Sequence, residues 1–141
     1  MIVRRLNELP AERVKSGENW ISRRLLLRGD GMGFSMHDTL IKAGTTTHIH
    51  YANHLEAVYC VRGKGSVELV GSGEVFPIEA GSIYALDQHD EHLLHAEEEM
   101  QMVCVFNPAL LGPETHDADG VYPLLDDAGQ PVRRQAQKEQ P

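Results

Sequence analysis

The chain contains 141 residues, with 13 Lys and Arg against 21 Asp and Glu, so its formal net charge at pH 7 is −8. This length suits one domain with a buried core and is too short for two ordinary domains. An acidic chain without a basic patch is repelled by phosphate backbones and anionic lipid surfaces, so we expect no nucleic-acid and no membrane partner.

The two cysteines, Cys60 and Cys104, lie inside apolar runs with no short motif around them. Such positions predict small, buried core residues in a reducing compartment. The residues after Met1 include no apolar segment of signal-peptide or membrane-spanning length. We therefore expect a soluble, cytoplasmic protein.

The first third of the chain predicts short elements separated by turns. Residues 2–6 alternate weakly, which favours an edge strand, and residues 9–15 favour one helical turn. Residues 20–28 predict a strand that ends at the turn signal Gly29-Asp-Gly31. Residues 33–41 alternate with neither face wholly apolar, which suits the wall of a barrel whose interior is partly polar.

The middle of the chain predicts a series of short strands. They cover residues 55–61, 65–70, 74–78, 82–86, 92–97 and 100–106. Turn signals every eight to twelve residues or so are typical of an all-β sandwich or barrel. Prolines and glycines interrupt residues 107–125, which predict an ordered loop. Residues 126–141 have almost no large apolar side chains and predict a disordered tail, so we expect the domain to span residues 1–125.

The stretch between Gly44 and Gly63 contains three of the eight histidines, His48, His50 and His54, together with Glu56. Imidazole and carboxylate groups that are closely spaced on a strand can bind one first-row cation, and glycines permit tight turns at both ends. We therefore expect a metal site on a β-hairpin. A polar loop that leads into a buried strand is the simpler alternative.

Strand alternation indicates which side chains could surround a cavity. On strand 55–61, Glu56 shares a face with apolar residues, and strand 100–106 has a matching apolar face. If both faces point into a barrel, Glu56 is a lone carboxylate in an apolar lining, which is costly unless it is paired or binds a metal. Tyr84 and His92 could face the same cavity.

The stretch with the histidines resembles the first motif of the cupin superfamily, in which a glycine, a His-x-His pair, a glutamate and a closing glycine supply most of a metal site. The spacing is altered here, because three residues separate Gly44 from His48 and five separate His50 from Glu56. The second cupin motif usually has a histidine where this chain has Tyr84. This chain therefore lacks the usual cupin metal site of three histidines and one glutamate.

Several blocks along the chain together resemble the L-ectoine synthase family of that superfamily. They are Gly31-Met-Gly-Phe-Ser35, Thr47-His-Ile-His-Tyr51, Asn53-His-Leu-Glu-Ala-Val-Tyr-Cys60, Leu86-Asp87, His89-Asp-Glu-His92, Val103-Cys-Val-Phe-Asn-Pro108 and His116-Asp-Ala-Asp-Gly-Val-Tyr-Pro123. The resemblance extends in register from residue 1 to about residue 125. Ala80 replaces the proline expected before Gly81, a change confined to a turn.

The resemblance implies an all-β, single-domain cupin-type β-barrel, also called a double-stranded β-helix or jelly roll. It implies a hydro-lyase that cyclises N-γ-acetyl-L-2,4-diaminobutyrate to the compatible solute ectoine with loss of water. It also implies Fe2+ as cofactor, a small-molecule substrate, a cytoplasmic location and a homodimer. The family's positions fall on Glu56, Tyr84 and His92 as metal ligands, on Trp20, Arg24, Thr39, Tyr51 and Phe106 as substrate contacts, and on His54, Glu114 and His116 as substrate contacts that could also relay protons.

Several of these residues would be given ordinary roles if they were taken singly. Arg24 would be a surface cation, and Glu114 and His116 would be solvated loop residues. The matching blocks together favour the site. His48 and His50 are the opposite case, in which the family resemblance argues against a site role. The cupin motif would make them metal ligands, whereas the closer family has its metal ligands elsewhere. This favours supporting or structural roles for the two histidines.

Three other functions stay open from the sequence. An iron dioxygenase would use His48, His50, Glu56 and a downstream histidine as ligands. A non-enzymatic cupin would bind a small solute without converting it. A drifted relative would act on a related amide or amidine with the same residues. In addition, residues 110–125 could close over the site as a lid.

Overall fold

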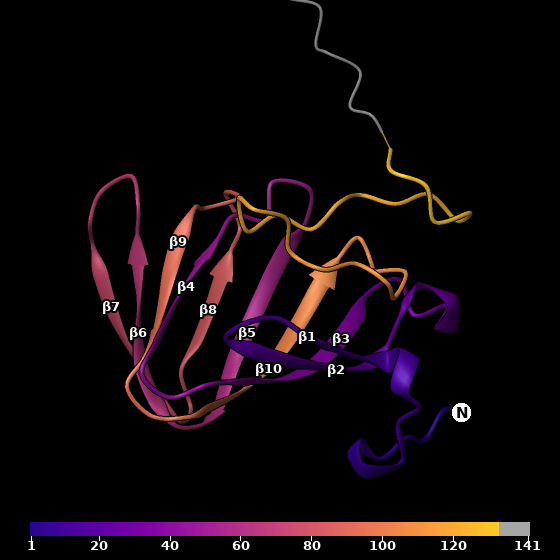
Figure 1. The fold of residues 1–141 in the computed structure, drawn as a ribbon, viewed down its shortest axis with the longest axis horizontal. Coiled ribbons are helices and arrows are strands. Elements are labelled where there is room, and N and C mark those ends of the chain that lie inside the picture. The colour runs from indigo at the N-terminus through magenta and orange to yellow at the C-terminus, as the bar shows by residue number, and fades with distance from the viewer. Residues whose placement is uncertain (133–141) are drawn as a thin grey trace, which may run out of the picture.

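The structure, a computed structural model, describes residues 1–132 and consists mainly of two antiparallel β-sheets (Figure 1). The strands are β1 (Val14–Ser16), β2 (Trp20–Leu26), β3 (Ser35–Ile41), β4 (Thr45–Ile49), β5 (Leu55–Arg62), β6 (Lys64–Leu69), β7 (Val75–Glu79), β8 (Ile83–Leu86), β9 (His92–Ala96) and β10 (Met100–Asn107). Three short 3-10 turns are η1 (Leu6–Glu8), η2 (Ala11–Arg13) and η3 (Arg28–Asp30). Within residues 1–132, no helix is long and apolar enough to cross a membrane.

The chain passes back and forth between the two sheets. The larger sheet has the order β1-β2-β3-β10-β5-β8, and the smaller sheet has the order β4-β9-β6-β7. Several strands that follow one another in the chain lie in different sheets, so the connections wrap the sheets into a barrel with one interior. This arrangement confirms the predicted all-β, single-domain barrel.

Alternation along each strand decides which side chains enter that interior. On β5, Val58 and Cys60 are buried, whereas Tyr59 and Val61 between and beside them are 47% and 45% exposed. The facing residues of β10, including Cys104, are buried as well. Both cysteines are free and buried, as predicted.

Strand β3 turns its more polar face inward. Ser35, His37 and Thr39 are buried, and Met36 and Leu40 on the other face are only partly buried. The prediction that residues 33–41 border a partly polar interior is therefore confirmed. The hydrogen-bonding groups on this strand are available to whatever occupies the barrel.

The six strands predicted between residues 55 and 106 are confirmed with small shifts at their ends. The edge strand predicted at residues 2–6 is wrong. Arg4 instead binds Asp30 through two side-chain hydrogen bonds of 2.7 and 3.0 Å and donates to the carbonyl of Leu25 at 2.9 Å. Side-chain anchoring therefore replaces strand pairing at this end of the chain. The predicted helical turn is present as η2.

The stretch between Gly44 and Gly63 does not form the predicted hairpin. β4 pairs with β9, whereas β5 pairs with β8 and β10 in the other sheet. Residues 50–54 carry the chain from one sheet to the other. Local sequence indicates the two strands, but their partners come from distant parts of the chain.

The segment after β10 crosses one end of the barrel, in orange and yellow in Figure 1. Residues 108–124 contain no strand, which confirms the predicted loop. The segment is attached at several points: the amide of Leu110 donates to Ser35 Oγ at 3.0 Å, and the amide of His50 donates to the carbonyl of Gly120 at 3.0 Å. The loop therefore forms part of the barrel's wall.

The predicted tail begins at Asp126, and its first residues are hydrogen-bonded. The amide of Asp126 donates to the carbonyl of Gln130 at 2.9 Å, and the amide of Val132 donates to the carbonyl of Leu124 at 2.7 Å. Residues 126–132 therefore make a turn against the segment that precedes them. The rest of the predicted tail, residues 133–141, lies outside the described residues.

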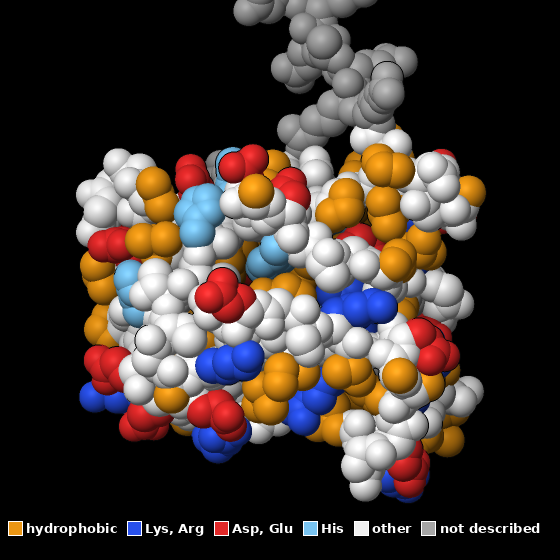
Figure 2. Space-filling model, in the orientation of Figure 1, with side chains coloured by type: hydrophobic (Ala, Val, Ile, Leu, Met, Phe, Trp, Pro, Cys, Tyr) orange, Lys and Arg blue, Asp and Glu red, His pale blue; other side chains and the backbone are white. Residues whose placement is uncertain are grey.

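The charged surface agrees with the acidic composition. On the face drawn in Figure 2, Lys and Arg side chains lie separately among Asp and Glu and form no continuous basic patch. Some basic residues are paired with acidic neighbours, as Arg62 is with Glu99 at 2.8 Å. Such exposed pairs contribute little to stability.

Candidate active site

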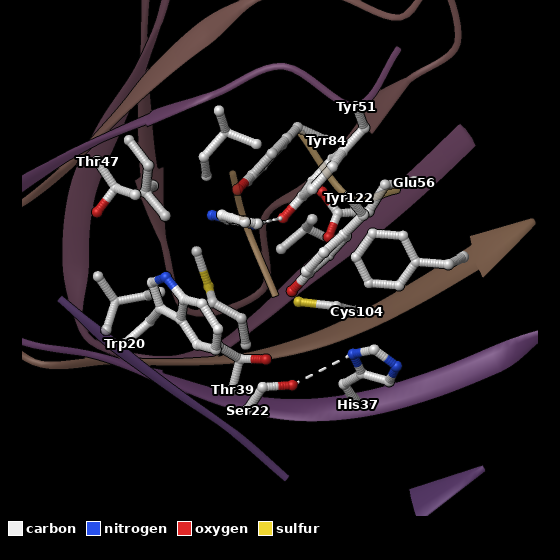
Figure 3. A pocket seen from close by; sticks show the side chains of 17 residues that line it. Trp20, Ser22, His37, Thr39, Thr47, Tyr51, Glu56, Tyr84, Cys104 and Tyr122 are labelled. Carbon is white, nitrogen blue, oxygen red and sulfur yellow. Dashed lines mark hydrogen bonds between the residues drawn. The ribbon is translucent and has the colours of Figure 1, made fainter. Parts of the chain in front are cut away.

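A cavity of about 40 Å³ lies between the two sheets and is partly walled by the C-terminal segment (Figure 3). Both sheets contribute inward-facing side chains to it. The residues that line it are Trp20, Ser22, His37, Thr39, Ile41, Thr47, Ile49, Tyr51, Glu56, Val58, Tyr84, Leu94, Met102, Cys104, Phe106, His116 and Tyr122. The lining is apolar for the most part and contains a small number of groups able to do chemistry, as is usual for small-molecule sites.

Glu56 is the acidic group of this cavity. It is 6% exposed, and burial raises the pKa of its carboxyl to about 8, with the Cys104 thiol acting in the opposite direction as a hydrogen-bond donor. No arginine or lysine within residues 1–132 forms an ion pair with it. A buried carboxylate without a cationic partner favours a bound cation, which would return it to the charged form.

Tyr84 lies close to Glu56 because β8 pairs with β5. Glu56 is opposite Leu86, and Val58 is opposite Tyr84, so Glu56 and Tyr84 are diagonal neighbours on the inner face. Burial raises the pKa of the Tyr84 phenol well above its usual value, and the charge of Glu56 adds to this effect. A phenol in this position would deprotonate only beside a strong positive charge.

His92 lies beside Tyr84, with ring centroids 6.2 Å apart. It is fully buried, and its Nδ1 is 2.9 Å from the carbonyl of Asp90. Because a carbonyl can only accept, Nδ1 carries the proton, and the Nε2 lone pair is buried without a hydrogen-bond partner. A neutral imidazole oriented in this way is typical of metal ligands.

Glu56, Tyr84 and His92 offer a carboxylate, a phenol and an imidazole nitrogen, which are donor types that can bind a metal ion. Within residues 1–132, no three His, Cys, Asp or Glu side chains are grouped so as to hold a metal. The fit therefore depends on the tyrosine. Two observations support this fit: Nε2 of His92 is buried without a hydrogen-bond partner, and the buried carboxyl of Glu56 has the Cys104 thiol as a hydrogen-bond donor but no cationic partner within residues 1–132.

Aromatic rings form the other side of the cavity. Tyr51 stacks on Tyr122 with ring centroids 5.0 Å apart and an interplanar angle of 12°. The Tyr51 phenol lies 2.8 Å from His116 Nε2, and Trp20 packs on the same imidazole at 5.2 Å. Burial lowers the pKa of His116 to about 4, so this imidazole is neutral near pH 7. Burial also raises the pKa of Tyr51 well above its usual value, so the phenol keeps its proton, and the tautomer of His116 sets which of the two groups donates.

Arg24 lies fully buried next to this aromatic wall. Its Nη1 donates to the carbonyl of Gly112 at 2.6 Å, and its guanidinium lies 5.7 Å from the centroid of the Tyr122 ring. Its Nη2 has no hydrogen-bond partner. A buried guanidinium with an unused donor is suited to an anionic group such as a carboxylate.

The profile of the family described as ectoine synthase matches residues 1–126. The chain belongs to the ectoine synthase family. The L-ectoine synthase of Halalkalibacterium halodurans is 63% identical over 126 residues, which are 89% of this chain and 98% of the relative. Ectoine synthases are enzymes of the hydro-lyase class.

Solved structures agree with this assignment. The crystal structure of ectoine synthase from P. lautus superimposes with a TM-score of 0.80 at 51% identity and covers 100% of this chain and 99% of the other. An RmlC-like cupin from Shewanella frigidimarina superimposes with a TM-score of 0.58 at 18% identity, covering 68% of this chain and 83% of the other. At that identity the likeness shows the cupin fold alone.

Most residues carried over from the ectoine synthase family converge on the cavity. Those that line it are Trp20, Thr39, Tyr51, Glu56, Tyr84, Phe106 and His116. His92 and Arg24 lie behind this lining and contact it through Tyr84 and Tyr122. The prediction from strand alternation that Glu56 and Tyr84 face the cavity is confirmed.

His54 and Glu114 are buried but do not line the cavity. Both carboxylate oxygens of Glu114 accept backbone amides, from Leu111 and from Gly112, at 2.7 Å each. Neither nitrogen of His54 has a hydrogen-bond partner, and burial lowers its pKa to about 4. In this arrangement Glu114 anchors the loop, which differs from the proton relay expected from the sequence.

His48 and His50 are not brought into the cavity. His48 is exposed, and its Nε2 lies 2.7 Å from Glu91 Oε1 on the surface. The dioxygenase alternative needs both histidines beside Glu56, and the structure does not place them there. His48 lies on β4 in the smaller sheet and His50 in the crossover, whereas Glu56 lies on β5 in the larger sheet, although the motif contains all three.

Among the cavity residues with side chains able to form hydrogen bonds, five were not predicted as site residues: Ser22, His37, Thr47, Cys104 and Tyr122. Alternation with Trp20 and Thr39 could have found Ser22 and His37, because each is two residues away on the same strand face. Cys104 was placed on the inner face but interpreted as a core residue only. Tyr122 lies in a loop, where no periodic signal exists.

Proposed function

We propose that the chain converts N-γ-acetyl-L-2,4-diaminobutyrate into ectoine by intramolecular cyclisation with loss of water. The α-amine attacks the acetamide carbonyl, a carbon–nitrogen bond forms, and the carbonyl oxygen leaves as water. Family membership supports the reaction. The observation that carries the proposal within the molecule is one small cavity that the buried Glu56 lines, with the buried Arg24 behind its Tyr122 wall and Nη2 of that arginine without a partner.

Glu56, Tyr84 and His92 would hold Fe2+, the cofactor we propose. Bound there, the ion would supply Lewis acidity that polarises the acetamide oxygen. His92 is prepared for this role because its proton is fixed on Nδ1 by the carbonyl of Asp90. Glu56 is prepared because nothing else in its surroundings neutralises a negative charge.

Arg24 binds the substrate carboxylate in this proposal. Its Nη1 is already fixed on the carbonyl of Gly112, which leaves Nη2 free for the ligand. Trp20 and Phe106 form apolar walls that exclude water and, with Thr39, hold the substrate folded so that amine and carbonyl meet. Positioning of this kind can supply roughly 7–11 kcal/mol of the barrier.

The hydrogen-bonded pair of Tyr51 and His116 moves the protons. With His116 in the tautomer that has Nε2 unprotonated, one amine proton passes to Tyr51 Oη as the phenolic proton passes to Nε2, and the reverse transfer protonates the alkoxide of the adduct to a hydroxyl. A second transfer by the same route carries another nitrogen-bound proton to that hydroxyl, which leaves as water. The low pKa of His116 keeps its imidazole neutral and ready to accept. Among the three candidates from the sequence, His116 is the one that lines the cavity.

The cavity of about 40 Å³ has room for only a few water molecules, so substrate binding requires the wall to move. We propose that residues 110–125 open and close as a lid. Substrate should then slow amide hydrogen exchange in these residues. Unchanged exchange rates would speak against the lid.

We further propose a cytoplasmic homodimer. β8 is an edge strand of the larger sheet. Its outward Ile83 is 67% exposed, and Tyr59 and Val61 on the neighbouring β5 are also exposed. An unpaired edge beside apolar side chains is complementary to a second copy of itself. Light scattering of the Ile83→Glu variant should report a monomer, and a dimer that survives this change would contradict the assignment of the interface.

The direct test is to incubate the purified protein with N-γ-acetyl-L-2,4-diaminobutyrate and ferrous iron and to follow ectoine by NMR. We expect turnover that a chelator abolishes and that iron restores. His92→Ala should lose both bound iron and turnover, whereas His48→Ala should keep both. A chelated enzyme that still forms ectoine would disprove the role of the metal.

A further inference from the structure

A buried serine hydroxyl lies between two basic side chains of the cavity wall. Ser22 is 1% exposed and lines the cavity. Its Oγ lies 3.3 Å from Nε of Arg24 and 3.3 Å from Nδ1 of His37, the second contact drawn in Figure 3. Sheet geometry brings the three together, because Ser22 and Arg24 share the inner face of β2 and Arg24 is opposite His37 on β3.

The direction of these hydrogen bonds follows from what each atom can do. Arg24 Nε can only donate, so Ser22 Oγ accepts from it. Oγ has no other acceptor in contact than His37 Nδ1, and donation to Nδ1 is the arrangement that uses the hydroxyl proton. The opposite direction would leave both that proton and the Nε2 lone pair buried and unpaired. His37 therefore carries its proton on Nε2.

His37 is kept neutral by its surroundings. Burial and the charge of Arg24 hold its pKa well below the usual value. Its Nε2 has no hydrogen-bond partner, and neither has Nη2 of Arg24. Two buried donors without acceptors are costly in the free protein, and an oxygen-rich ligand in the cavity would satisfy them.

We propose that Ser22 is a positioning residue for the substrate: its hydroxyl orients the guanidinium of Arg24 and fixes His37 in the tautomer that presents Nε2–H to the bound molecule. This inference rests on the proposed function, in which Arg24 binds the carboxylate of an N-acetylated diamino acid. Ser22 itself need not touch the reacting atoms. Because this one hydroxyl orients two hydrogen-bond donors for the substrate, its loss weakens substrate binding and leaves the rate of the chemical step nearly unchanged.

The kinetic test compares three variants of the iron-loaded protein. Ser22→Ala should raise KM about tenfold and leave kcat within about twofold, the effect expected when a hydrogen bond to a charged group is lost. Ser22→Thr keeps the hydroxyl and should restore KM. The control is Ser66→Ala, which removes a half-buried serine hydroxyl of β6 that does not line the cavity, and it should leave KM unchanged.

A second readout does not depend on turnover. In the metal-free protein, the ring nitrogens of His37 can be assigned by long-range ¹⁵N–¹H NMR. We expect the Nε2–H tautomer in the wild type and in Ser22→Thr, and loss of this preference in Ser22→Ala. An unchanged KM together with an unchanged tautomer in Ser22→Ala would overturn the inference. A wild-type protein that does not cyclise the substrate would instead overturn the proposed function, and the tautomer would still decide the role of Ser22.

Discussion

The phenol of Tyr51 lies 2.8 Å from Nε2 of His116, and this hydrogen bond joins the crossover between the two sheets to the C-terminal segment. The two residues are 65 positions apart in the chain. Tyr51 is 4% exposed and also stacks on Tyr122, so the bond is shielded from water. The segment that closes the cavity is therefore coupled to the wall that carries the proposed proton relay.

Removing the phenol oxygen of Tyr51 tests this coupling. Tyr51→Phe keeps the ring stacking but deletes the hydrogen bond, so we expect a stability loss of about 1 kcal/mol and a fall in kcat of at least about tenfold. Urea unfolding and steady-state kinetics measure the two effects. Tyr59→Phe is the control, because Tyr59 is exposed on the outer face. A kcat equal to that of the control would exclude Tyr51 from the relay.

Glu114→Gln tests the anchor that holds the loop near Arg24. The amide group of glutamine would meet one of the two backbone donors, Leu111 or Gly112, and we expect a stability loss of roughly 2–3 kcal/mol. Because the carbonyl of Gly112 orients Arg24, KM should rise while kcat changes little. An exposed Glu74→Gln variant provides the baseline. A large fall in kcat at constant KM would instead make Glu114 a proton-transfer group.

Substitutions at Gly120 and Gly73 distinguish the stability cost of backbone strain from that of close packing. Its φ is 73°, and a Cβ there would collide with the carbonyl of His48, whereas Gly73 has a φ of 71° and open space around it. Gly73→Ala should therefore cost only the left-handed backbone strain, about 1 kcal/mol. Gly120→Ala should cost more and should also reduce turnover, because His116 lies on the displaced segment. Thermal unfolding and activity of the pair give the comparison, and equal losses would show that packing at Gly120 is unimportant.

Stability should depend on pH through the buried histidines. Burial lowers the pKa of both His54 and His116 to about 4. Between pH 6.5 and pH 4 the unfolded chain binds protons at these positions and the folded chain does not, so the free energy of unfolding falls as the pH is lowered through this window.

Urea unfolding of the metal-free protein at several pH values measures this dependence. His54→Gln should show a shallower slope than the wild type, because one of the two groups is gone. His48→Gln alters an exposed histidine and should keep the wild-type slope. A slope unaffected by His54→Gln would mean that the pKa of this imidazole is the same in the folded and unfolded states.

The sequence by itself determined the strands and their inner faces, because alternation between apolar and polar residues is a local property that burial enforces. Glu56 and Tyr84 were found on the inner face in this way. The blocks shared with the ectoine synthase family determined the remaining candidates, including His92. Turn signals likewise placed the loop after β10.

Only the tertiary structure decided which of these residues meet. The partners of β4 and β5 come from distant segments, so the histidine-rich stretch is split between two sheets and His48 faces away from Glu56. Side-chain hydrogen bonds are also decided there: Glu114 turns to the backbone of its own loop and away from the cavity, and Ser22 joins Arg24 to His37 on the neighbouring strand. Such contacts depend on packing and on the direction of each donor, which residue order does not specify.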